Sequence, residues 1–483
     1  MSSKSSQGSA LSTGCSSGGW DRPKKERVRD DFPKSVVRTP WSGRSLRHVA
    51  VNKLVRTKGS RLHYPDREVV ALPFLRRCLW PLSAILFREA CRRGILPPDE
   101  LSNNTVPITV RPAARRGSQT MRVVTLGEVM IRMMPPGWGR LTQSLPGVLE
   151  ATFGGAEVNV AVSIAAQGGT AAYCSALPDN PITTAFAGEL RKYGVDDSLL
   201  IRSPEGRFGI YFVENGANQR GGTVTYDRAG STISIVPPDR YPWDDIFAEA
   251  TWFHITGITP SISQTAADVA RVSIEEAARR GVPVSCDLNF RKKLWNWQPG
   301  TKPAALARQT MESLLPHMQV LIANEEDADH VLGIRAAGTD VDAGVLNLAG
   351  YEDVARQIVA KFPNLQRVAI TLRESVSASH NNWGAMLFDA VADRAYFAPV
   401  DADGRYSPYE IHNIIDRVGA GDAFAGGLVF ALHTPGLSES PTALAYAVAA
   451  SCLKHSIRGD FNDSTRSEIE ALMRGGGSGR VSR

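Results

Sequence analysis

Residues 416–427 of this chain read Asp-Arg-Val-Gly-Ala-Gly-Asp-Ala-Phe-Ala-Gly-Gly, and this stretch decides the fold. The glycine-rich turn runs directly into an apolar segment, residues 428–432, which predicts the start of a helix. The backbone N–H groups of Gly419, Ala420 and Gly421 are then expected at the helix N-terminus, where they lack intrahelical partners. Because a helix N-terminus favours negative charge, the stretch predicts an anion-binding site.

One carboxylate, Asp422, lies within this predicted anion site. A carboxylate there competes with a bound phosphate for the same positive field, so we expect it to take part in chemistry. Asp422 would accept a proton from a hydroxyl, while the N–H groups of residues 419–421 stabilise charge on a transferring phosphoryl group. The alternative is a glycine-rich helix start capped by an aspartate. A P-loop kinase is excluded because the chain contains no GxxxxGK[ST] motif.

The charge of the chain is unevenly distributed. The 483 residues are 43% hydrophobic with a net charge of +6. Residues 1–120 hold 23 Lys and Arg against 9 Asp and Glu, and the remainder holds 32 against 40. The part that carries the motif is therefore acidic, and we expect no nucleic acid as its partner.

The cysteines and the hydropathy indicate the compartment. The six cysteines are scattered without a CxxC pair, which favours a reducing compartment and no zinc site. No run of about 18 apolar residues is present, so we expect no membrane span. These features predict a cytoplasmic protein.

Residues 1–120 begin with a Ser/Gly-rich tract and continue with scattered Arg, Lys and Pro, so we expect a mostly disordered basic extension. Three interpretations stay open: a start codon chosen upstream of Met121, a targeting peptide, or a basic interaction arm. The first is favoured because a strand-like segment follows Met121 at once. Acidic residues such as Asp21 and Glu26 argue against a transit peptide. The Gly/Ser-rich end, residues 475–483, is expected to be a flexible tail.

The chain from residue 122 onward alternates strand-like and helix-like segments, which predicts an α/β fold. Such alternation is typical of a parallel sheet covered by helices on both faces, with ligands at the carboxyl ends of the strands. Two alternating segments at 209–213 and 222–228 predict a separate hairpin or small sheet. The other expected strands are 122–128, 251–256, 282–288, 319–323 and 368–374, and the expected helices are 156–167, 263–280, 303–315, 420–432, 442–455 and 464–473.

The sequence Gly-Ala-Gly-Asp-Ala-Phe at 419–424, preceded by Asp416, resembles the signature of the ribokinase-like (PfkB) sugar kinases. The resemblance covers about residues 121–474. It implies a ribokinase-like domain with a mostly parallel central sheet, helices on both faces and a small β-sheet lid at about 209–228. It also implies ATP and Mg²⁺ as cofactors, and a homo-oligomer formed through the lid.

A second motif, Asp-x-Asn-x-Arg-x-x-Leu-Trp at 287–295, is similar to the 2-keto-3-deoxygluconate kinases within that family. There the arginine pairs with the sugar-acid carboxylate, a role that falls to Arg291, whose planar fork suits a carboxylate. A solvated basic turn with Lys292 and Lys293 is the alternative. The resemblance implies phosphorylation of the C6 hydroxyl of 2-keto-3-deoxygluconate, with sugar contacts from Gly154, Gly155, Asn159, Tyr211, Tyr226, Arg228, Ile258, Arg291 and Asp460.

The segments that the resemblance places near ATP and Mg²⁺ differ more from the family pattern. Asn324-x-x-Asp327 stands where the family has Asn-x-x-Glu, so Asp327 is expected to reach Mg²⁺ through water. A Gly-x-x-Gly turn is missing after 368–374, where Arg373 could instead form a surface ion pair with Glu374. Tyr446 stands where relatives carry an asparagine near adenine, and it could stack on the base or simply pack. The expected nucleotide contacts are Asn289, Asn324, Thr371, Arg373 and Tyr446.

Two other functions stay open. Another PfkB kinase would act on fructose, a neutral ketose or 5-keto-2-deoxygluconate. A non-catalytic sugar-acid sensor would use the kinase scaffold with its basic arm on nucleic acid or protein, but loss of the general base is expected there, and Asp422 is present.

Overall fold

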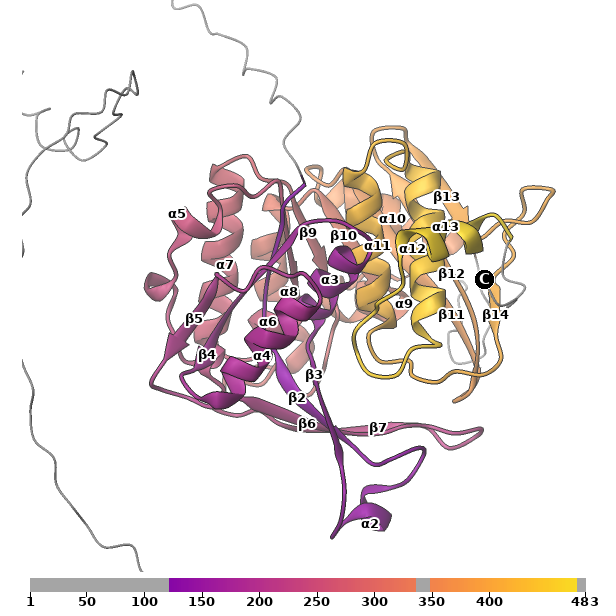
Figure 1. Ribbon diagram of the computed structural model, residues 1–483. Helices are drawn as coiled ribbons and strands as arrows, with labels where there is room; N and C mark the ends of the chain where they lie inside the picture. Colours follow the sequence, from indigo (N-terminus) through magenta and orange to yellow (C-terminus); the bar gives the residue numbers. More distant parts are fainter. Residues whose placement is uncertain (1–120, 336–347, 476–483) are drawn as a thin grey trace, which may run out of the picture. The chain divides into compact units, whose positions relative to one another are not determined.

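The structure is a computed structural model that describes residues 121–335 and 348–475. The predictions for the extension at 1–120 therefore concern residues outside the described part. The same holds for the tail beyond residue 475. In the described residues, the alternation of strands and helices gives the predicted α/β fold (Figure 1).

The central sheet has ten strands in the described part of the chain. Seven neighbouring strands, from β5 to β11, are parallel, and β12, β13 and β14 add antiparallel pairs at one edge. Their order is β13 (Arg394–Ala398), β12 (His380–Asp389), β11 (Arg367–Ser377), β10 (Val320–Asn324), β9 (Val284–Asp287), β8 (Trp252–Thr256), β1 (Val123–Leu126), β4 (Ala171–Pro178) and β5 (Leu200–Ser203), with β14 (Tyr409–Ile411) beside β12.

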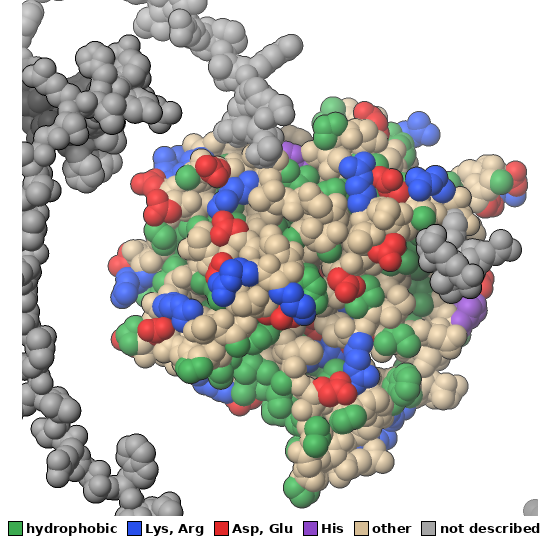
Figure 2. Space-filling view, viewed as in Figure 1, with side chains coloured by type: hydrophobic (Ala, Val, Ile, Leu, Met, Phe, Trp, Pro, Cys, Tyr) green, Lys and Arg blue, Asp and Glu red, His purple; other side chains and the backbone are tan. Residues whose placement is uncertain are grey.

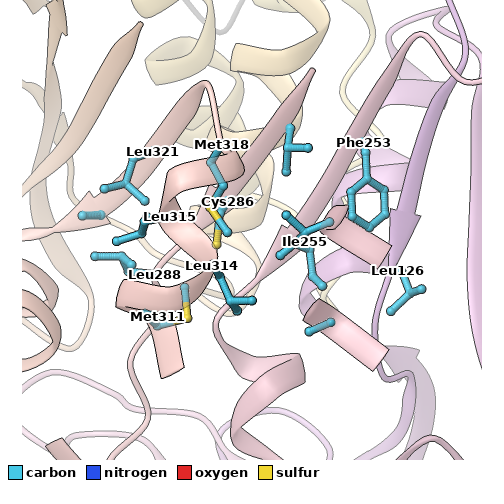
Figure 3. Close-up of a cluster of buried hydrophobic side chains, with 14 of the residues drawn as sticks. Leu126, Phe253, Ile255, Cys286, Leu288, Met311, Leu314, Leu315, Met318 and Leu321 are labelled. Carbon is cyan, nitrogen blue, oxygen red and sulfur yellow. The ribbon is translucent and has the colours of Figure 1, made fainter. Parts of the chain in front are cut away.

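Helices cover both faces of this sheet, as predicted, because each face is apolar. One face packs against α7 (Gln264–Arg279), α8 (Pro303–Leu314) and α10 (Leu348–Lys361). Figure 3 shows part of this core, in which Phe253, Ile255 and Leu321 of the strands belong to one apolar cluster with Met311 and Leu314 of α8. The other face packs against α3 (Ala156–Ala166), α4 (Pro181–Lys192), α11 (Ala420–His433), α12 (Ser440–Lys454) and α13 (Arg466–Met473).

Short helical segments connect the larger elements. They are α2 (Leu141–Ser144), η1 (Thr232–Ser234), η2 (Pro238–Arg240), α5 (Trp243–Ile246), α6 (Ile258–Ser261), η3 (Leu315–His317), α9 (Glu325–Asp327) and η4 (Ala328–Leu332).

A second sheet projects from the central body and is larger than the predicted hairpin (Figure 1). It has four strands in the described residues, in the order β3 (Glu150–Gly154), β2 (Met130–Met134), β6 (Gly209–Glu214) and β7 (Thr223–Asp227). Strand β6 pairs antiparallel with β7, as expected, but parallel with β2. The prediction missed β2 and β3. The residues of β2 alternate between buried and half-buried, but its sequence Met-Ile-Arg-Met-Met does not alternate apolar and polar residues, so the strand pattern is not visible in the sequence.

The surface of the described residues carries both basic and acidic side chains (Figure 2). On the face in Figure 2, basic and acidic side chains are interspersed over the body, and hydrophobic side chains gather towards the strands of the second sheet. All five residues of β7 are exposed, including Val224 and Tyr226. Exposed apolar side chains on an edge strand are a feature of association surfaces.

Candidate functional site

A cavity of about 330 Å³ lies at the carboxyl ends of the central strands, and strands of the second sheet form part of its wall. The predicted site residues come together here from segments more than 300 positions apart in the sequence. Sixteen of them line the cavity: Gly155, Asn159, Tyr211, Tyr226, Ile258, Asn289, Arg291, Asn324, Asp327, Thr371, Arg373, Gly419, Ala420, Gly421, Asp422 and Asp460.

The N-terminus of α11 forms one wall of the cavity. Gly419 is the N-cap residue, with φ of 85°, and a Cβ atom there would lie 2.1 Å from the carbonyl oxygen of Asp460. Glycine is therefore required at this position. The N–H of Ala420 donates to the carbonyl of Arg417 at 3.3 Å. The N–H groups of Gly419 and Gly421 have no acceptor among the described residues, which leaves these two, rather than all three, available to an anion.

Asp422 lies in the first turn of α11, with 9% of its surface exposed. Its Oδ2 atom accepts a hydrogen bond from Asn159 Nδ2 at 2.6 Å. Burial raises the pKa of Asp422 to about 6, and the charge of Asp460 adds to this, against the hydrogen bond of Asn159 and the charges of Arg291 and Lys454. A carboxylate with a pKa near 6 is ionised at neutral pH and can accept a proton.

Asp460 is the centre of the network beside Asp422. Its Oδ2 accepts from Tyr211 OH at 2.6 Å and from Asn159 Nδ2 at 3.4 Å, and its Oδ1 accepts from Arg132 at 2.6 Å. A Cβ at Gly154 would lie 2.3 Å from Asp460 Oδ2, so this glycine, which does not line the cavity, makes room for the aspartate.

Two further carboxylates lie at the ends of β9 and β10. Asp287, which the sequence analysis did not single out, is 9% exposed and lines the cavity. Burial raises the pKa of Asp287, and the nearby Asp327 and Asp422 raise it further. Asp327 accepts from the N–H groups of Phe290 at 3.0 Å and Asn324 at 3.2 Å, so its oxygen atoms are partly occupied.

These carboxylates fit a hydrated divalent cation. Asp327 and Asp422 both raise the pKa of the buried Asp287, and a nearby positive charge would stabilise such a group of carboxylates. No group of three or more His, Cys, Asp or Glu within 121–335 and 348–475 is placed to enclose a metal ion directly. Mg²⁺ keeps several of its water molecules and needs only one or two carboxylates, so Asp287 and Asp327 suit contact through water.

Three arginines line the cavity without a salt bridge to any described carboxylate: Arg291, Arg373 and Arg417. Arg291 donates to the carbonyl of Phe290 at 3.0 Å, and Arg417 donates to the carbonyl of Ala378 at 2.7 Å. Burial lowers the pKa of Arg417, and the adjacent charge of Arg373 lowers it further. Unpaired guanidinium groups at one cavity favour anionic ligands.

Three predicted contacts do not line this cavity: Gly154, which lies beside Asp460, and the side chains of Tyr446 and Arg228. Tyr446 is fully buried in the core, where its ring stacks on Phe430 with centroids 5.6 Å apart, so it packs and does not face a nucleotide. Arg228 pairs with Glu128 instead and lines a neighbouring cavity of about 510 Å³. The considered ion pair between Arg373 and Glu374 is also absent from the described residues, and Glu374 accepts from Asn382 Nδ2 at 2.8 Å.

The structure adds residues that the sequence analysis did not assign. Arg417 lies inside the 416–427 stretch, and Asp416 was noted only as part of the signature. Arg132 and Lys454 are fully buried charges within otherwise apolar segments, which is the one sequence signal that marks them. A buried charge needs a partner, and both side chains point to the network around Asp416 and Asp460.

A helix N-terminus with free N–H groups, a buried base and unpaired arginines defines a site for phosphoryl transfer to a hydroxyl. Residues 121–463 match the pfkB family carbohydrate kinase profile, and the chain belongs to this family. The chain is accordingly a phosphotransferase that acts on a sugar hydroxyl, and kinases of this family take ATP as phosphoryl donor. In the described part of the chain, no helix has the length and apolar character needed to cross a membrane.

Three relatives illustrate the similarity. A 2-dehydro-3-deoxygalactonokinase of Haloferax volcanii is 32% identical over 360 residues, which cover 74% of this chain and 99% of the relative. The crystal structure of a 2-dehydro-3-deoxygluconokinase from Thermotoga maritima is 41% identical with a TM-score of 0.66, covering 73% of this chain and 99% of that one. A fructokinase of Escherichia coli is 27% identical over 320 residues, which cover 66% of this chain and 86% of the relative.

Proposed function

We propose that the protein is a 2-dehydro-3-deoxygluconokinase, which transfers the γ-phosphoryl group of ATP to the C6 hydroxyl of 2-keto-3-deoxygluconate. One observation carries the proposal: the cavity that contains Asp422 and the N-terminus of α11 also contains Arg291, a cation that forms no salt bridge with any carboxylate of the described residues. A neutral sugar gives such a cation no partner, whereas a sugar acid does. The similarity to kinases of two sugar acids supports the same conclusion.

Asp422 acts as the general base in this proposal. Its carboxylate accepts the proton of the C6 hydroxyl, and Asn159 orients it through the hydrogen bond of 2.6 Å. The free N–H groups of Gly419 and Gly421 stabilise negative charge on the transferring group. Ala420 contributes the turn between them, since its own N–H is engaged by Arg417.

The sugar binds between the second sheet and the N-terminus of α3. Arg291 pairs with the carboxylate, and Tyr211, Asn159 and Asp460 orient the hydroxyl groups, with Gly155, Ile258 and Tyr226 completing the wall. Gly154 and Arg228 do not line the cavity and act indirectly. Gly154 leaves space for the side chain of Asp460, and Arg228 forms an ion pair with Glu128.

The nucleotide phosphates bind at the opposite end of the cavity. Arg373 and Arg417 are the cations there, and Thr371, Asn289 and Asn324 offer hydrogen bonds. Asp287 and Asp327 would hold Mg²⁺ through water, and the bound ion would neutralise charge on the phosphate oxygens. The second sheet covers the site and excludes water, so that ATP is not hydrolysed.

The wider organisation follows from this function. Residues 121–474 form the kinase domain, and the second sheet, including the lid strands at 209–228, provides the surface for a homo-oligomer. The position of β7 at the edge of this sheet, with all five of its residues exposed, supports that surface. The enzyme works in the cytoplasm, where ATP is supplied, and its kinase domain binds neither membrane nor nucleic acid.

A second candidate is a kinase of another sugar. The similarity to a fructokinase favours fructose, and the similarity to a 2-dehydro-3-deoxygalactonokinase favours the galactonate epimer. 5-Keto-2-deoxygluconate is a further sugar acid that Arg291 could bind. A non-catalytic sensor is disfavoured because Asp422 is present and positioned at the helix N-terminus.

The test is a comparison of kcat/KM for the full chain with ATP and each of five acceptors: 2-keto-3-deoxygluconate, its galactonate epimer, 5-keto-2-deoxygluconate, gluconate and fructose. The proposal expects 2-keto-3-deoxygluconate to exceed fructose by about tenfold or more, which is about 1.4 kcal/mol. A preference for fructose would refute the role of Arg291 in substrate selection. A preference for another sugar acid would keep that role and replace the substrate.

A further inference from the structure

Strand β2 of the second sheet buries a charge at its centre. The strand alternates buried and half-buried residues, and Arg132 takes a buried position between Met130 and Met134. None of its side chain is exposed. A charge taken out of water is strongly unfavourable unless partners compensate it, so its contacts explain why an arginine stands here.

The guanidinium of Arg132 bridges two carboxylates from separate parts of the chain. One nitrogen donates to Asp460 Oδ1 at 2.6 Å, and the other donates to Asp416 Oδ2 at 2.5 Å. Although burial opposes the charge, Asp460 and Asp416 hold the pKa of Arg132 above its usual value. The planar fork of an arginine suits such a bridge, whereas a single ammonium group reaches one carboxylate well.

Asp416 begins the loop that leads to the helix N-terminus. Its Oδ1 accepts from the N–H of Val418 at 3.1 Å, and its Oδ2 accepts from the N–H of Gly459 at 3.2 Å. The carboxylate thus shapes the turn that presents Gly419. On the other side of this loop, Arg417 is bound to the backbone of the β11–β12 hairpin. Contacts on two sides therefore fix the loop. Arg132 of the second sheet makes the contact on one side, and the β11–β12 hairpin makes the contact on the other.

Asp460 connects the same guanidinium to the sugar. In the parallel pairing of β2 with β6, Arg132 lies opposite Tyr211, and both side chains reach Asp460, one at each carboxylate oxygen. Asn159, which orients Asp422, also contacts Asp460. Three hydrogen bonds thus connect Arg132 to the general base, through Asp460 and Asn159. Arg132 also bonds directly to Asp416, the carboxylate that shapes the phosphate loop.

We propose that Arg132 is a positioning residue that ties the second sheet to both Asp416 and Asp460, so that the anion-binding turn and the sugar-binding carboxylate keep the spacing needed for phosphoryl transfer. The inference rests on the proposed roles of Gly419, Gly421 and Asp422. Lys454 supports the same turn from below, with its ammonium 3.1 Å from the carbonyl of Ile457 and 3.5 Å from that of Asp416.

The experiment compares Arg132→Met and Arg132→Lys with native full-length protein. The control is Arg122→Met, which breaks an Arg–Asp pair of 2.9 Å with Asp196, whose residues do not line the cavity. Each variant is assayed with ATP and the acceptor that the native enzyme phosphorylates fastest. A wrong substrate assignment therefore shows in the native panel and leaves this test intact.

Arg132→Met is expected to lower kcat by about 10²-fold, because a misplacement of about 1 Å has that effect on catalysis. The KM for ATP should stay within about threefold of native, since Arg373 and Arg417 are untouched. The KM for the sugar should rise, because Asp460 loses a partner. Arg132→Lys keeps the positive charge but loses the planar fork, so its kcat should lie between that of Arg132→Met and that of native protein. The control variant Arg122→Met should keep kcat within about twofold of native.

A general loss of active protein would lower the apparent kcat in proportion to the folded fraction, which circular dichroism and active-site titration with ATP measure independently. Native-like kcat in a folded Arg132→Met variant would overturn the proposal. Should Arg132→Met not fold, Arg132→Lys decides: a kcat within about twofold of native shows that the bridge between the two carboxylates is not needed.

Discussion

Replacing Asp422 with asparagine should remove activity and stabilise the fold at the same time. The side chain keeps its size and can still accept a hydrogen bond from Asn159, but it can no longer take the proton of a hydroxyl. A positioned general base contributes about 10²–10⁴-fold, so kcat should fall by that factor, which corresponds to about 3–5 kcal/mol in the barrier.

The expected gain in stability follows from the pKa. Burial first, and then Asp460, raise the pKa of Asp422 from 3.8 to about 6. An acid whose pKa is raised by folding favours the folded state below pH 4, and this contribution is lost as the pH rises through 6. At pH 8 the ionised carboxylate therefore destabilises the fold by up to about 3 kcal/mol, at 1.36 kcal/mol per pKa unit. Asparagine removes this destabilisation because it carries no charge. Part of the gain is offset because the hydrogen bond from Asn159 is weaker to a neutral amide than to a carboxylate.

Urea unfolding at pH 8 and pH 4, together with kcat at pH 8, measures both effects. The Asp422→Asn variant should unfold at higher urea than native protein at pH 8, and the difference should disappear near pH 4. Asp179→Asn, at an exposed pair with Arg202, is the control and should change neither quantity by much. A folded Asn variant with native kcat would refute the role of Asp422, and lower stability at pH 8 would refute the effect of its burial.

Three further predictions concern single groups. The kcat/KM of native enzyme for the sugar should decrease about tenfold per pH unit below pH 6, as Asp422 of the free enzyme takes up a proton, and a kcat/KM profile flat down to pH 5 would contradict its pKa of about 6. Arg291→Ala should raise the KM for sugar acids by tenfold or more while a neutral sugar is little affected, with the neighbouring Lys292→Ala as control; an equal loss for both sugars would contradict a carboxylate contact. Tyr446→Phe should leave the KM for ATP unchanged and keep or raise stability by about 1 kcal/mol in thermal unfolding, because the buried hydroxyl has no partner among the described residues; a higher KM for ATP would restore the predicted adenine contact.

The positions of residues 416–427 at one helix N-terminus could be predicted from the sequence, because local chemistry determines them. The glycines of residues 416–427 require a turn into a helix, and Asp422 can then only lie at the helix N-terminus. The ends of β9 and β10 meet at one edge of a parallel sheet, so Asn289, Arg291 and Asp327 were expected to lie together. Strand and helix patterns located β1, β8 to β11 and most of the long helices to within a few residues, but β4, β12, α4 and α10 were not predicted.

The rest depended on contacts between distant segments, which local patterns do not show. Tyr446 stands in an apolar helix, and only the packing of α12 against α11 turns its ring to Phe430. Arg228 occupies the position of a sugar contact, but Glu128, 100 residues earlier, binds it. The charge of Arg132 within β2 was visible in the sequence, whereas its two partners lie 284 and 328 residues further on.

The central claim is the transfer of phosphate to the C6 hydroxyl of 2-keto-3-deoxygluconate, and two-dimensional ¹H–³¹P correlation NMR of the reaction with ATP and Mg²⁺ tests it most directly. The account predicts one new phosphomonoester whose phosphorus couples to the two protons of the C6 methylene group, formed together with an equal amount of ADP. ADP without a sugar phosphate, or a phosphorus coupled to a single ring or chain proton, would contradict it.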